Sequence, residues 1–292
     1  MPQKFAVIGT PITHSLSPII HDAIFAHEGR DATMGRIDPL TAEQLAQDLA
    51  SWLAEGTFEG LAITAPYKPL VANLEGERSE EVDALESANT LTRRTGIKKG
   101  TPALWQVDNT DVAGFTSAIQ KLLSPIKYRT FVVFGTGATA RTIVYALQAQ
   151  EAAMIQVVGR SLGKAQGCIH TVEESVSGGA QVTRLSASTV PPGKRFDCAI
   201  NATTLGISAH DELVFPLSWF KEYAASVFDV VYRPHGTTRL IKEATSRGID
   251  ALDGRAMLYA QALEQARIWG ATTPDDELME VITKAGEEGM TL

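Results

Sequence analysis

The chain has 292 residues, enough for one large or two ordinary domains, with 44% hydrophobic and 21% charged residues. With a formal net charge of −8, the chain has no overall basic field of the kind that favours nucleic acids or anionic membranes, so any anionic ligand would be held by local cations. No apolar run reaches the roughly 20 residues of a membrane span, and the N-terminus shows no signal-peptide pattern. We therefore expect a cytoplasmic protein, a monomer or a homodimer, without nucleic-acid or membrane partners.

Short apolar runs alternate with longer amphipathic segments, a pattern typical of βαβ units and mostly parallel sheets. In chain order, the runs predict strands at 4–9, 32–38, 58–64, 87–94, 129–135, 154–159, "DCAIN" and "SVFDVV", and helices at 18–29, from Thr41 onward, at 110–123 and at 253–270. Segments 94–102 and 175–194 are rich in Gly, Lys, Ser, Thr and Pro and predict surface loops. The expected fold class is α/β.

The two cysteines do not suggest a metal site. Cys168 and Cys198 are 30 positions apart in the sequence and match no metal-ligand spacing. Two isolated cysteines are typical of a reducing compartment, so we expect free thiols and no metal.

A domain junction is predicted near 110–125, because Pro125 lies just before the strongest predicted strand. We expect an N-terminal α/β substrate domain at 1–110, completed by a return segment at 253–292. Residues 111–252 are expected to form a Rossmann-type, doubly wound nucleotide domain. Helices at 110–123 and 253–270 would link the two domains.

A glycine-rich turn follows the strongest strand, in "VVFGTGATARTIVYAL". Gly135, Gly137 and Ala140 match G-x-G-x-x-G/A between a strand and a helix, the context that dinucleotide binding requires. Gly135 permits the tight turn, Gly137 lets the backbone approach a pyrophosphate, and Ala140 lets helix and strand pack closely. The alternative is a glycine turn without a ligand. The predicted cofactor loop also includes Thr136, Ala138 and Thr139.

The next strand ends in "VVGRSLGKA", where an NAD-specific domain usually has an acidic residue for the ribose 2′-hydroxyl. Arg160, Ser161 and Lys164 lie there instead. Two cations and a hydroxyl suit a 2′-phosphate better than a bare ribose, so the pattern favours NADP over NAD. The alternative is that Arg160 and Lys164 are ordinary surface charges at a helix start.

Ordered motifs along residues 5–285 resemble those of the shikimate dehydrogenase family. Besides the glycine turn and the basic "GRS", the chain has "GTPITHSLSP", "AITAPYK" ending at Lys68, "SANT" with Asn89, and D-N-T-D at Asp108 to Asp111. It continues with I-N-A-T at Ile200 to Thr203, D-x-x-Y-x-P at Asp229 to Pro234, and G-x-x-M-L-x-x-Q-A at Gly254 to Ala262. Another Rossmann enzyme would share only the glycine turn by chance.

The resemblance implies reversible hydride transfer between NADPH and 3-dehydroshikimate, a step of aromatic amino acid and chorismate biosynthesis. It implies that Ser15 and Ser17 hold the substrate carboxylate through hydroxyl donors. From the residues alone, Ser17 before Pro18 also predicts a helix N-cap, and both roles stay open. The other implied substrate residues are Thr64, Asn89, Tyr232 and Gln261.

The same resemblance implies that Lys68 and Asp111 are the catalytic pair. Reduction places a hydride on a carbonyl carbon, so the developing alkoxide needs charge stabilisation and a proton. A lysine beside a carboxylate supplies both, and accepts the proton in the reverse direction. Lys68 is therefore either an acid/base group or chiefly a positioning and charge-stabilising group. Without the motif, it would be interpreted as a surface charge.

Further cofactor contacts are implied on the nicotinamide side, where an apolar wall would exclude water from the hydride path. Met257 also suits simple core filling, and an exposed helix charge is an equally good interpretation of Glu80. These implied contacts are Glu80, Thr203, Val230, Gly254 and Met257.

Three positions depart from the family pattern. Ala62 stands where the family usually has an asparagine before V-T-x-P-x-K, which puts the geometry of that loop in doubt. Ala138 replaces a common glycine, which is tolerated if its φ is negative. Gly159 replaces the usual asparagine before Arg160 and removes one possible cofactor contact.

Two other functions stay open. The family also contains quinate or dual quinate/shikimate dehydrogenases, often using NAD. The hydroxyl of Ser17 and the basic "GRS" turn favour shikimate and NADP. A non-catalytic ligand-sensing homologue is disfavoured because Lys68 and Asp111 are both present.

Overall fold

The computed structural model describes residues 2–39, 41–95, 103–173, 180–186, 195–208, 210–216, 223–233 and 236–291. The chain divides into two compact units, residues 1–110 with 261–292 (unit 1) and residues 111–260 (unit 2). The chain passes from unit 2 back to unit 1 inside helix α10 (Arg255–Ile268), whereas the sequence-based division placed the return at 253. The ligand roles of the two domains stay predictions.

Unit 1 contains a six-stranded mixed sheet in the order β2-β1-β3-β5-β6-β4. Its strands are β1 (Gln3–Ile8), β2 (Ala32–Ile37), β3 (Gly60–Ile63), β4 (Gly76–Arg78), β5 (Thr90–Arg94) and β6 (Leu104–Asp108). The pairs β1–β2, β1–β3 and β4–β6 are parallel, while β5 is antiparallel to both β3 and β6. The carboxyl ends of β1 and β3 therefore lie at the same edge.

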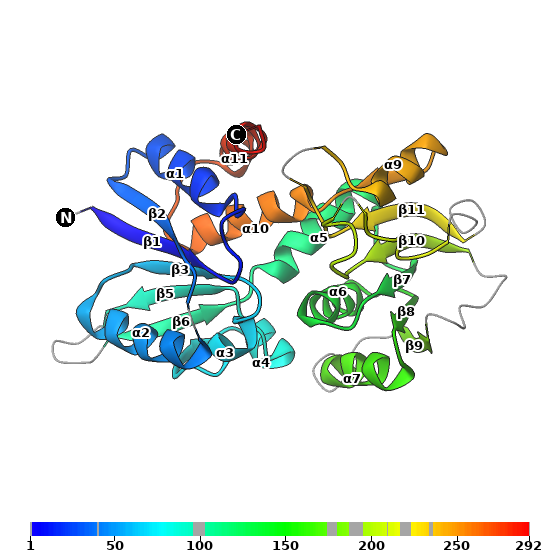
Figure 1. Ribbon diagram of the computed structural model, residues 1–292, viewed down its shortest axis with the longest axis horizontal. Coiled ribbons are helices and arrows are strands. Elements are labelled where there is room, and N and C mark those ends of the chain that lie inside the picture. Colours follow the sequence, from blue (N-terminus) through cyan, green and yellow to red (C-terminus); the bar gives the residue numbers. More distant parts are fainter. Residues whose placement is uncertain are drawn as a thin grey trace. The chain divides into compact units, whose positions relative to one another are not determined.

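Helices cover both faces of this sheet, and Figure 1 shows α2, α3 and α4 together on one face. Their apolar side chains pack with Ala6 and Ile8, whereas Phe5 and Val7 pack with Phe25 and Trp269 on the opposite face. Strand β1 is thus buried on both faces, which explains its continuous apolar run. The helices of unit 1 are α1 (Ser17–His27), α2 (Ala42–Glu55), α3 (Lys68–Ala72), α4 (Glu80–Leu85), the end of α10, and α11 (Asp275–Gly289).

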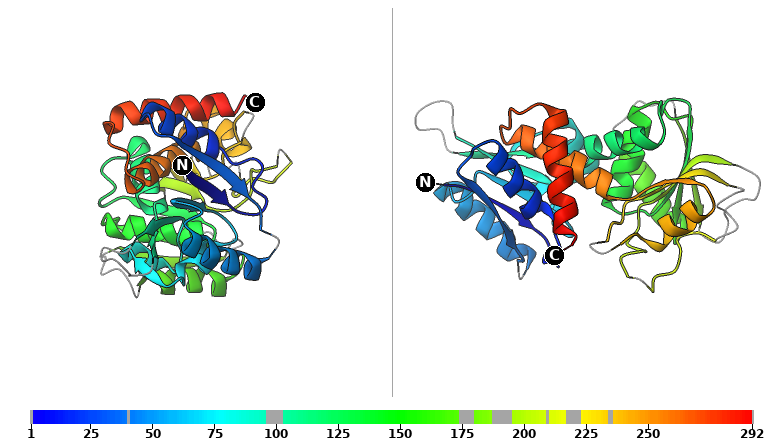
Figure 2. Two further views of the ribbon diagram at one scale, coloured as in Figure 1. Left: turned by 90° about the vertical axis from the view of Figure 1, so that its left-hand side faces the viewer. Right: turned by 90° about the horizontal axis from the view of Figure 1, so that it is seen from above.

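The last helix runs along the first one, as Figure 2 shows from two directions. Gly289 lies so close to α1 that an added Cβ would be 2.9 Å from Ile19 Cδ1. The return segment therefore completes the core of unit 1 rather than forming a separate tail.

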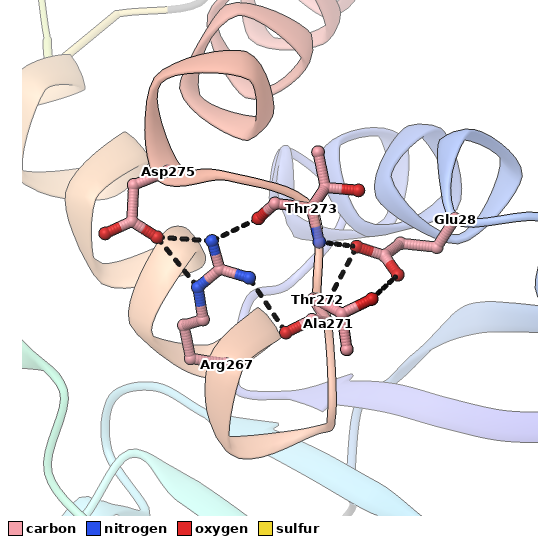
Figure 3. A network of polar contacts seen from close by, with 6 residues as sticks. All are labelled: Glu28, Arg267, Ala271, Thr272, Thr273 and Asp275. Carbon is pink, nitrogen blue, oxygen red and sulfur yellow. Dashed lines mark hydrogen bonds and ion pairs between the residues drawn. The ribbon is translucent and has the colours of Figure 1, made fainter.

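A polar network holds the turn between α10 and α11 against the end of α1 (Figure 3). The Glu28 carboxylate accepts hydrogen bonds from the backbone N–H groups of Thr272 at 2.9 Å and Thr273 at 2.8 Å. These bonds, chiefly that from Thr273, lower the pKa of Glu28 to about 2. Arg267 donates to the Ala271 carbonyl at 2.8 Å and pairs with Asp275. The network fixes the direction in which α11 leaves α10.

Unit 2 contains a six-stranded sheet in the order β12-β11-β10-β7-β8-β9, and every neighbouring pair is parallel. The strands are β7 (Thr130–Phe134), β8 (Met154–Gly159), β9 (Gln181–Ser186), β10 (Phe196–Asn201), β11 (Ala224–Asp229) and β12 (Asp250–Leu252). This order is the doubly wound Rossmann order: the first three strands extend the sheet from β7 to one side and the last three to the other, so the strand order reverses between β7 and β10. The predicted fold class is confirmed.

Helices cover both faces of the second sheet as well. Leu240 of α9 packs with Phe134 and Val158 on one face, and Phe115 of α5 meets Phe228 edge to face at 5.5 Å between ring centroids. The helices are α5 (Asp111–Leu122), α6 (Ala138–Ala149), α7 (Leu162–Glu173), α9 (Arg239–Ser246) and the start of α10. In the described residues, no helix combines the length and apolar character of a membrane span.

Two local predictions need correction. Helix α1 begins at Ser17, so Leu16 rather than Ser17 is its N-cap residue. Strand β9 crosses the segment 175–194 that was predicted to be a loop, because it is a polar sheet-edge strand without a strong apolar pattern. Residues 96–102, 174–179 and 187–194 of the two predicted loops lie outside the described residues. Thr41 does cap α2, since its hydroxyl accepts from Gln44 N at 3.1 Å.

Candidate active site

Most of the predicted cofactor residues of unit 2 lie directly after the carboxyl ends of its strands, while Lys164 and Met257 lie in the first turns of the following helices α7 and α10. Because all pairs in this sheet are parallel, these ends share one edge, and ligands of open α/β sheets bind there at the strand-order reversal. The glycine turn follows β7, at that reversal. The other strand ends are followed by Arg160 and Ser161 after β8, Thr203 after β10, Val230 after β11 and Gly254 after β12.

The glycine turn has the geometry of a phosphate-binding loop. Gly135 has a φ of +128°, and an added Cβ would be 2.6 Å from the Ala202 carbonyl oxygen. At Gly137, the N-cap of α6, an added Cβ would meet no heavy atom within 4 Å. Open space in front of a helix N-terminus suits the close approach of an anion. These residues therefore fit the pyrophosphate of a dinucleotide.

The alanines of this motif also fit their predicted places. Ala138 is the first residue of α6 and is absent from the residues with positive φ, so its methyl group is tolerated. Ala140 is fully buried, as close packing of helix and strand requires. Thr136 and Thr139 are half-buried beside them.

The basic turn after β8 is exposed, and Ser161 Oγ accepts a hydrogen bond from Lys164 N at 3.4 Å at the start of α7. Neither Arg160 nor Lys164 has an acidic partner among the described residues. At Gly159, an added Cβ would be 2.9 Å from Thr136 Cγ2, so the threonine methyl occupies the space beside this residue. The Ser161 carbonyl oxygen at 3.0 Å and Ala165 N at 3.2 Å from the same position also leave little room for a side chain at 159.

A buried polar cluster, which sequence reasoning did not single out, orders the loops after β10 and β11. Asn201 Nδ2 donates to Asp229 Oδ1 at 2.9 Å, and Asn201 Oδ1 accepts from Thr203 N at 3.0 Å. Asp229 also accepts from Val231 N at 3.1 Å and from Thr238 Oγ1 at 2.6 Å. Asn201 belongs to the I-N-A-T motif and Asp229 to the D-x-x-Y-x-P motif, so the sequence motifs already marked both residues.

The Asp229 carboxyl group is completely buried. Burial is the main reason why its pKa rises to about 6, and the hydrogen bonds from Thr238, Val231 and Asn201 oppose that rise. The charge of Asp253 adds to the rise, although Asp253 is itself paired with Arg255 at 2.7 Å. The pKa of Asp229 therefore lies close to the physiological range.

Three of the residues predicted for the nicotinamide side, Thr203, Val230 and Gly254, lie close together within unit 2, whereas Glu80 belongs to unit 1. An added Cβ at Gly254 would be 2.0 Å from the Val230 carbonyl oxygen, so only glycine permits this contact. Val230 N in turn donates to the Asn201 carbonyl at 3.0 Å, next to Thr203. Met257, in the first turn of α10, is 7% exposed, as core filling also requires.

Tyr232 is half-buried in the same unit. Burial raises the pKa of its hydroxyl to about 12, with a smaller contribution from Tyr259, so the phenol is neutral and available as a hydrogen-bond donor. Pro234, the end of this motif, lies outside the described residues.

In unit 1, the loops that carry Ser15 and Thr64 pack against each other after β1 and β3. Thr64 N donates to the Ile8 carbonyl at 2.8 Å, and an added Cβ at Gly9 would be 2.3 Å from Thr64 Cγ2. Ser15 Oγ accepts from Ser17 N at 3.3 Å, so Ser15, rather than Ser17, makes the local turn. Both serines are half-buried.

Asn89 is held rigidly at the start of β5 and is 2% exposed. Its Nδ2 donates to Thr110 Oγ1 at 2.9 Å, and its Oδ1 accepts from Thr110 N at 2.8 Å. Ala88 N donates to the Lys68 carbonyl at 3.1 Å. Backbone hydrogen bonds and the Asn89 amide thus connect the start of α3, the start of β5 and the residue before Asp111.

The remaining predicted residues are placed as follows. Lys68 is the first residue of α3 in unit 1, whereas Asp111 is the first residue of α5 in unit 2 and is 3% exposed. Their juxtaposition stays a prediction. Glu80 is exposed at the start of α4, and Gln261 is half-buried in α10. Their roles stay predictions.

Ala62 belongs to an apolar cluster with Phe5, Val7, Ile12, Phe25, Met34 and Trp269. Its direct neighbour across the β3–β5 pair is Thr90, whose hydroxyl accepts a hydrogen bond from Gln265 Nε2 at 3.0 Å. A polar contact to this strand pair therefore comes from α10 rather than from position 62. Gln265 and its partner His21 were missed by sequence reasoning, because no motif or spacing marked them.

The two cysteines are buried and free, and burial raises the pKa of Cys168 to about 11 and of Cys198 to about 12. They are therefore unreactive thiols near neutral pH. Within the part of the chain that the structure describes, no group of His, Cys, Asp and Glu side chains could hold a metal ion.

Comparisons with known proteins agree with this geometry. Residues 7–91 match the family model "Shikimate dehydrogenase substrate binding domain". The chain is 32% identical to "Shikimate dehydrogenase (NADP(+))" of Geobacter sp. (strain M21) over 279 residues, which cover 94% of this chain and 92% of that protein. It is 31% identical to "Quinate/shikimate dehydrogenase (NAD(+))" of Corynebacterium glutamicum over 274 residues, 92% of this chain and 93% of that protein.

Solved structures give the same result. Shikimate 5-dehydrogenase from Thermus thermophilus, in complex with NADP(H) and shikimate, has a TM-score of 0.78 and 26% identity, covering 97% of this chain and 99% of that one. Quinate dehydrogenase from Corynebacterium glutamicum, in complex with NAD, has a TM-score of 0.81 and 28% identity, covering 97% and 99%. Motifs, fold and near full-length similarity show that the chain belongs to the shikimate/quinate dehydrogenase family.

Proposed function

We propose that the chain is an NADP-dependent oxidoreductase that reversibly reduces 3-dehydroshikimate to shikimate, in the cytoplasmic route to chorismate and aromatic amino acids. The observation that carries the proposal is the carboxyl edge of the unit 2 sheet. There, an open glycine turn leads into the N-terminus of α6. The neighbouring strand β8 is followed by Arg160 and Ser161 rather than by an acidic residue. Identity of 32% with a named shikimate dehydrogenase (NADP(+)) supports the substrate.

The cofactor supplies the hydride when it is bound. In the proposal, the backbone of Gly135 to Ala140 receives its pyrophosphate, while Arg160, Ser161 and Lys164 bind its 2′-phosphate. Thr203, Val230, Gly254 and Met257 line the nicotinamide side and exclude water from it. Glu80 contributes at the same end from unit 1.

The substrate groups come from both units in this proposal. The hydroxyls of Ser15 and Ser17 bind the carboxylate, and both serines are half-buried beside Thr64. Lys68 Nζ stabilises the developing alkoxide and gives it a proton, and Asp111 orients the ammonium group. In the oxidation direction Lys68 accepts the proton again. Hydrogen bonds to the ring hydroxyls come from Thr64, Asn89, Tyr232 and Gln261.

The catalytic pair is supported by contacts inside unit 1. Thr110, which precedes Asp111, is hydrogen-bonded to Asn89 through both its backbone and its hydroxyl. Ala88, which precedes Asn89, is bonded to the Lys68 carbonyl at 3.1 Å. Thr110, the residue before α5, is therefore connected through Asn89 and Ala88 to the backbone carbonyl of Lys68.

A second candidate, a quinate or dual quinate/shikimate dehydrogenase using NAD, has one observation in its favour. The relative from Corynebacterium glutamicum that is named quinate/shikimate dehydrogenase (NAD(+)) is 31% identical, nearly as similar as the NADP relatives. The exposed cations after β8 favour the first candidate, because a bare ribose leaves them without a ligand.

The test is a matrix of kcat/KM values for shikimate and quinate, each with NADP and NAD. We expect the highest value for shikimate with NADP. A maximum for quinate with NAD would replace the main proposal by the second candidate.

Variants at the catalytic pair separate an enzyme from a non-catalytic sensor. Lys68→Ala and Asp111→Asn should each lower kcat by about 10²- to 10⁴-fold while shikimate still binds, as expected for loss of proton transfer. Lys4→Ala, at an exposed position of β1, is the matched control and should leave kcat unchanged. Turnover of the wild type equal to that of Lys68→Ala, with shikimate bound, would show a sensor instead.

A further inference from the structure

A chain of hydrogen bonds between buried side chains joins α1, α10 and β5 within unit 1. His21 Nε2 lies 3.2 Å from Gln265 Oε1, Gln265 Nε2 lies 3.0 Å from Thr90 Oγ1, and Thr90 Oγ1 lies 2.9 Å from Asn89 Oδ1. None of these four side chains is more than 3% exposed. Water therefore does not replace any link, and the direction of each hydrogen bond matters.

The backbone carbonyl of Asn89 sets the direction at the Gln265 end. A carbonyl oxygen only accepts hydrogen bonds, and it lies 3.3 Å from Gln265 Nε2. The nitrogen of the Gln265 carboxamide must therefore face β5, and its oxygen must face His21. It follows that His21 Nε2 carries the ring proton.

His21 is suited to this part because its ring stays neutral. Burial lowers the pKa of His21 to about 4, with a smaller contribution from the charge of Arg30, although the bond to Gln265 opposes the change. Its other ring nitrogen, Nδ1, is buried and has no hydrogen-bond partner among the described residues. A proton on Nδ1 would therefore have no acceptor, so the neutral ring keeps its single proton on Nε2.

The hydroxyl group of Thr90 links Gln265 to Asn89. One lone pair of Thr90 Oγ1 is occupied by the N–H of Gln265, and Ala62, directly across the strand pair, has no polar atom to offer. The single hydroxyl proton of Thr90 points to Asn89 Oδ1, which only accepts. Gln265 thus makes the Thr90 hydroxyl a donor towards Asn89.

The hydrogen bonds between Thr110 and Asn89 independently assign the same orientation to the Asn89 carboxamide. Its backbone N–H, which only donates, lies 2.8 Å from Asn89 Oδ1, while its hydroxyl receives Asn89 Nδ2 at 2.9 Å. Both ends of the network therefore assign the same positions to the oxygen and nitrogen of the Asn89 carboxamide.

We propose that Gln265 is a positioning residue for substrate binding: through Thr90, and together with Thr110, it fixes which end of the Asn89 carboxamide is presented to the substrate. This inference rests on the proposed function, in which Asn89 binds a ring hydroxyl or the carboxylate. A carboxamide that can flip offers a donor and an acceptor at the same place, and a fixed one offers a single polarity. Substrate affinity gains from that preorganisation.

The test uses two variants that break the hydrogen-bond chain His21–Gln265–Thr90–Asn89 (the relay variants) and one that leaves it intact. Gln265→Met removes all three hydrogen bonds of the amide, to His21, Thr90 and the Asn89 carbonyl, at similar volume, and Thr90→Val removes the hydroxyl link. Thr92→Val is the matched control, because Thr92 lies two residues further along β5, is 7% exposed, and its hydroxyl has no partner among the described residues. Equilibrium unfolding of each variant checks that it is folded.

The kinetic readout is the KM for shikimate. We expect Gln265→Met and Thr90→Val each to raise it by about 5- to 20-fold, the usual effect of one buried hydrogen bond, with kcat and the KM for NADP within about twofold. In an Asn89→Ala background, the same changes should raise it no further. An equal rise in that background, or a rise with Thr92→Val, would overturn the inference.

A measurement without substrate separates this inference from the proposed function. Hydrogen exchange of the Asn89 side-chain amide protons, followed by NMR, should be about tenfold faster in Gln265→Met and Thr90→Val and unchanged in Thr92→Val. Unchanged exchange in both relay variants would overturn the inference, whatever the activity. Absence of shikimate turnover in the wild type, with exchange as expected, would overturn the proposed function alone.

Discussion

Asn201 Nδ2 donates a hydrogen bond of 2.9 Å to Asp229 Oδ1, inside a part of unit 2 where the carboxyl group is 0% exposed. The pair joins the ends of two adjacent parallel strands, β10 and β11, at Asn201 and Asp229, which are also direct partners in the sheet register. Its hydrogen bonds hold the first residues of both following loops, Thr203 and Val231. The geometry of the proposed nicotinamide side therefore depends on one buried carboxyl group.

The first prediction concerns the pH dependence of stability. The pKa of Asp229 is raised from 3.8 to about 6, so the folded state binds this proton more tightly than the unfolded state. The resulting stabilisation is complete below pH 3.8 and is lost as the pH rises through 6. The full change is roughly 3 kcal/mol, from 1.36 kcal/mol for each pKa unit.

Asp229→Asn is the comparison that isolates this effect, since asparagine does not titrate. The free energy of unfolding of the wild type minus that of Asp229→Asn, from urea titrations between about pH 4 and pH 7.5, should fall as the pH rises. A constant loss of hydrogen bonds in the variant shifts the curve but does not tilt it. Parallel pH profiles would show that Asp229 does not titrate in this range.

The second prediction compares two glycines of one turn. Gly137→Ala should leave the free energy of unfolding within about 0.5 kcal/mol of the wild type, because an added Cβ meets no atom within 4 Å. It should weaken NADPH binding by about tenfold, since the methyl group occupies the space proposed for the pyrophosphate. Fluorescence titration with NADPH measures this, and unchanged affinity would contradict the proposed phosphate site.

Gly135→Ala is the contrasting variant. Its φ of +128° and the approach of 2.6 Å to the Ala202 carbonyl leave no room for a side chain. We expect a loss of stability of about 2 kcal/mol or more. The pair thus separates a glycine required by the fold from one required by the ligand.

The third prediction is a coupling between Thr136 and Gly159. Gly159→Ala should destabilise the wild type by about 1–2 kcal/mol, because the new Cβ would be 2.9 Å from Thr136 Cγ2, 3.0 Å from the Ser161 carbonyl oxygen and 3.2 Å from Ala165 N. Thr136→Ser removes that methyl group and keeps the hydroxyl, so Gly159→Ala should cost less in this background. A double-mutant cycle of unfolding free energies measures the difference, and additive effects would refute the coupling.

The fourth prediction concerns cofactor selectivity. Arg160→Gln and Lys164→Gln should each raise the KM for NADP by about 10- to 100-fold, because each removes a charge-assisted hydrogen bond to the proposed 2′-phosphate. The KM for NAD should stay within about twofold. Lys242→Gln, at an exposed position of α9, is the control and should change neither value. Equal losses with NADP and NAD would place both cations outside the phosphate site.

Much of this protein could be predicted from local patterns. The apolar run before Gly135 and the G-x-G-x-x-A spacing predicted strand, turn and helix in their observed order, and the strand before Arg160 ends at the expected residue, Gly159. Edge strands such as β9, with the sequence QVTRLS, and the exposed β4, with the sequence GER, escaped prediction because neither contains the continuous apolar run that marks the inner strands.

By itself, the sequence determined the α/β class, through the alternation of apolar runs and amphipathic segments, and the glycine turn after β7 and the basic turn after β8, since each turn depends on neighbours within one strand–turn–helix segment. Tertiary structure alone decided that Gln265 meets Thr90, 175 residues away, and that Asp229 meets Asn201. A buried polar group must find a partner, but the identity of that partner depends on which elements the topology packs together. That is why the network behind Asn89 carries no signal in the order of the residues.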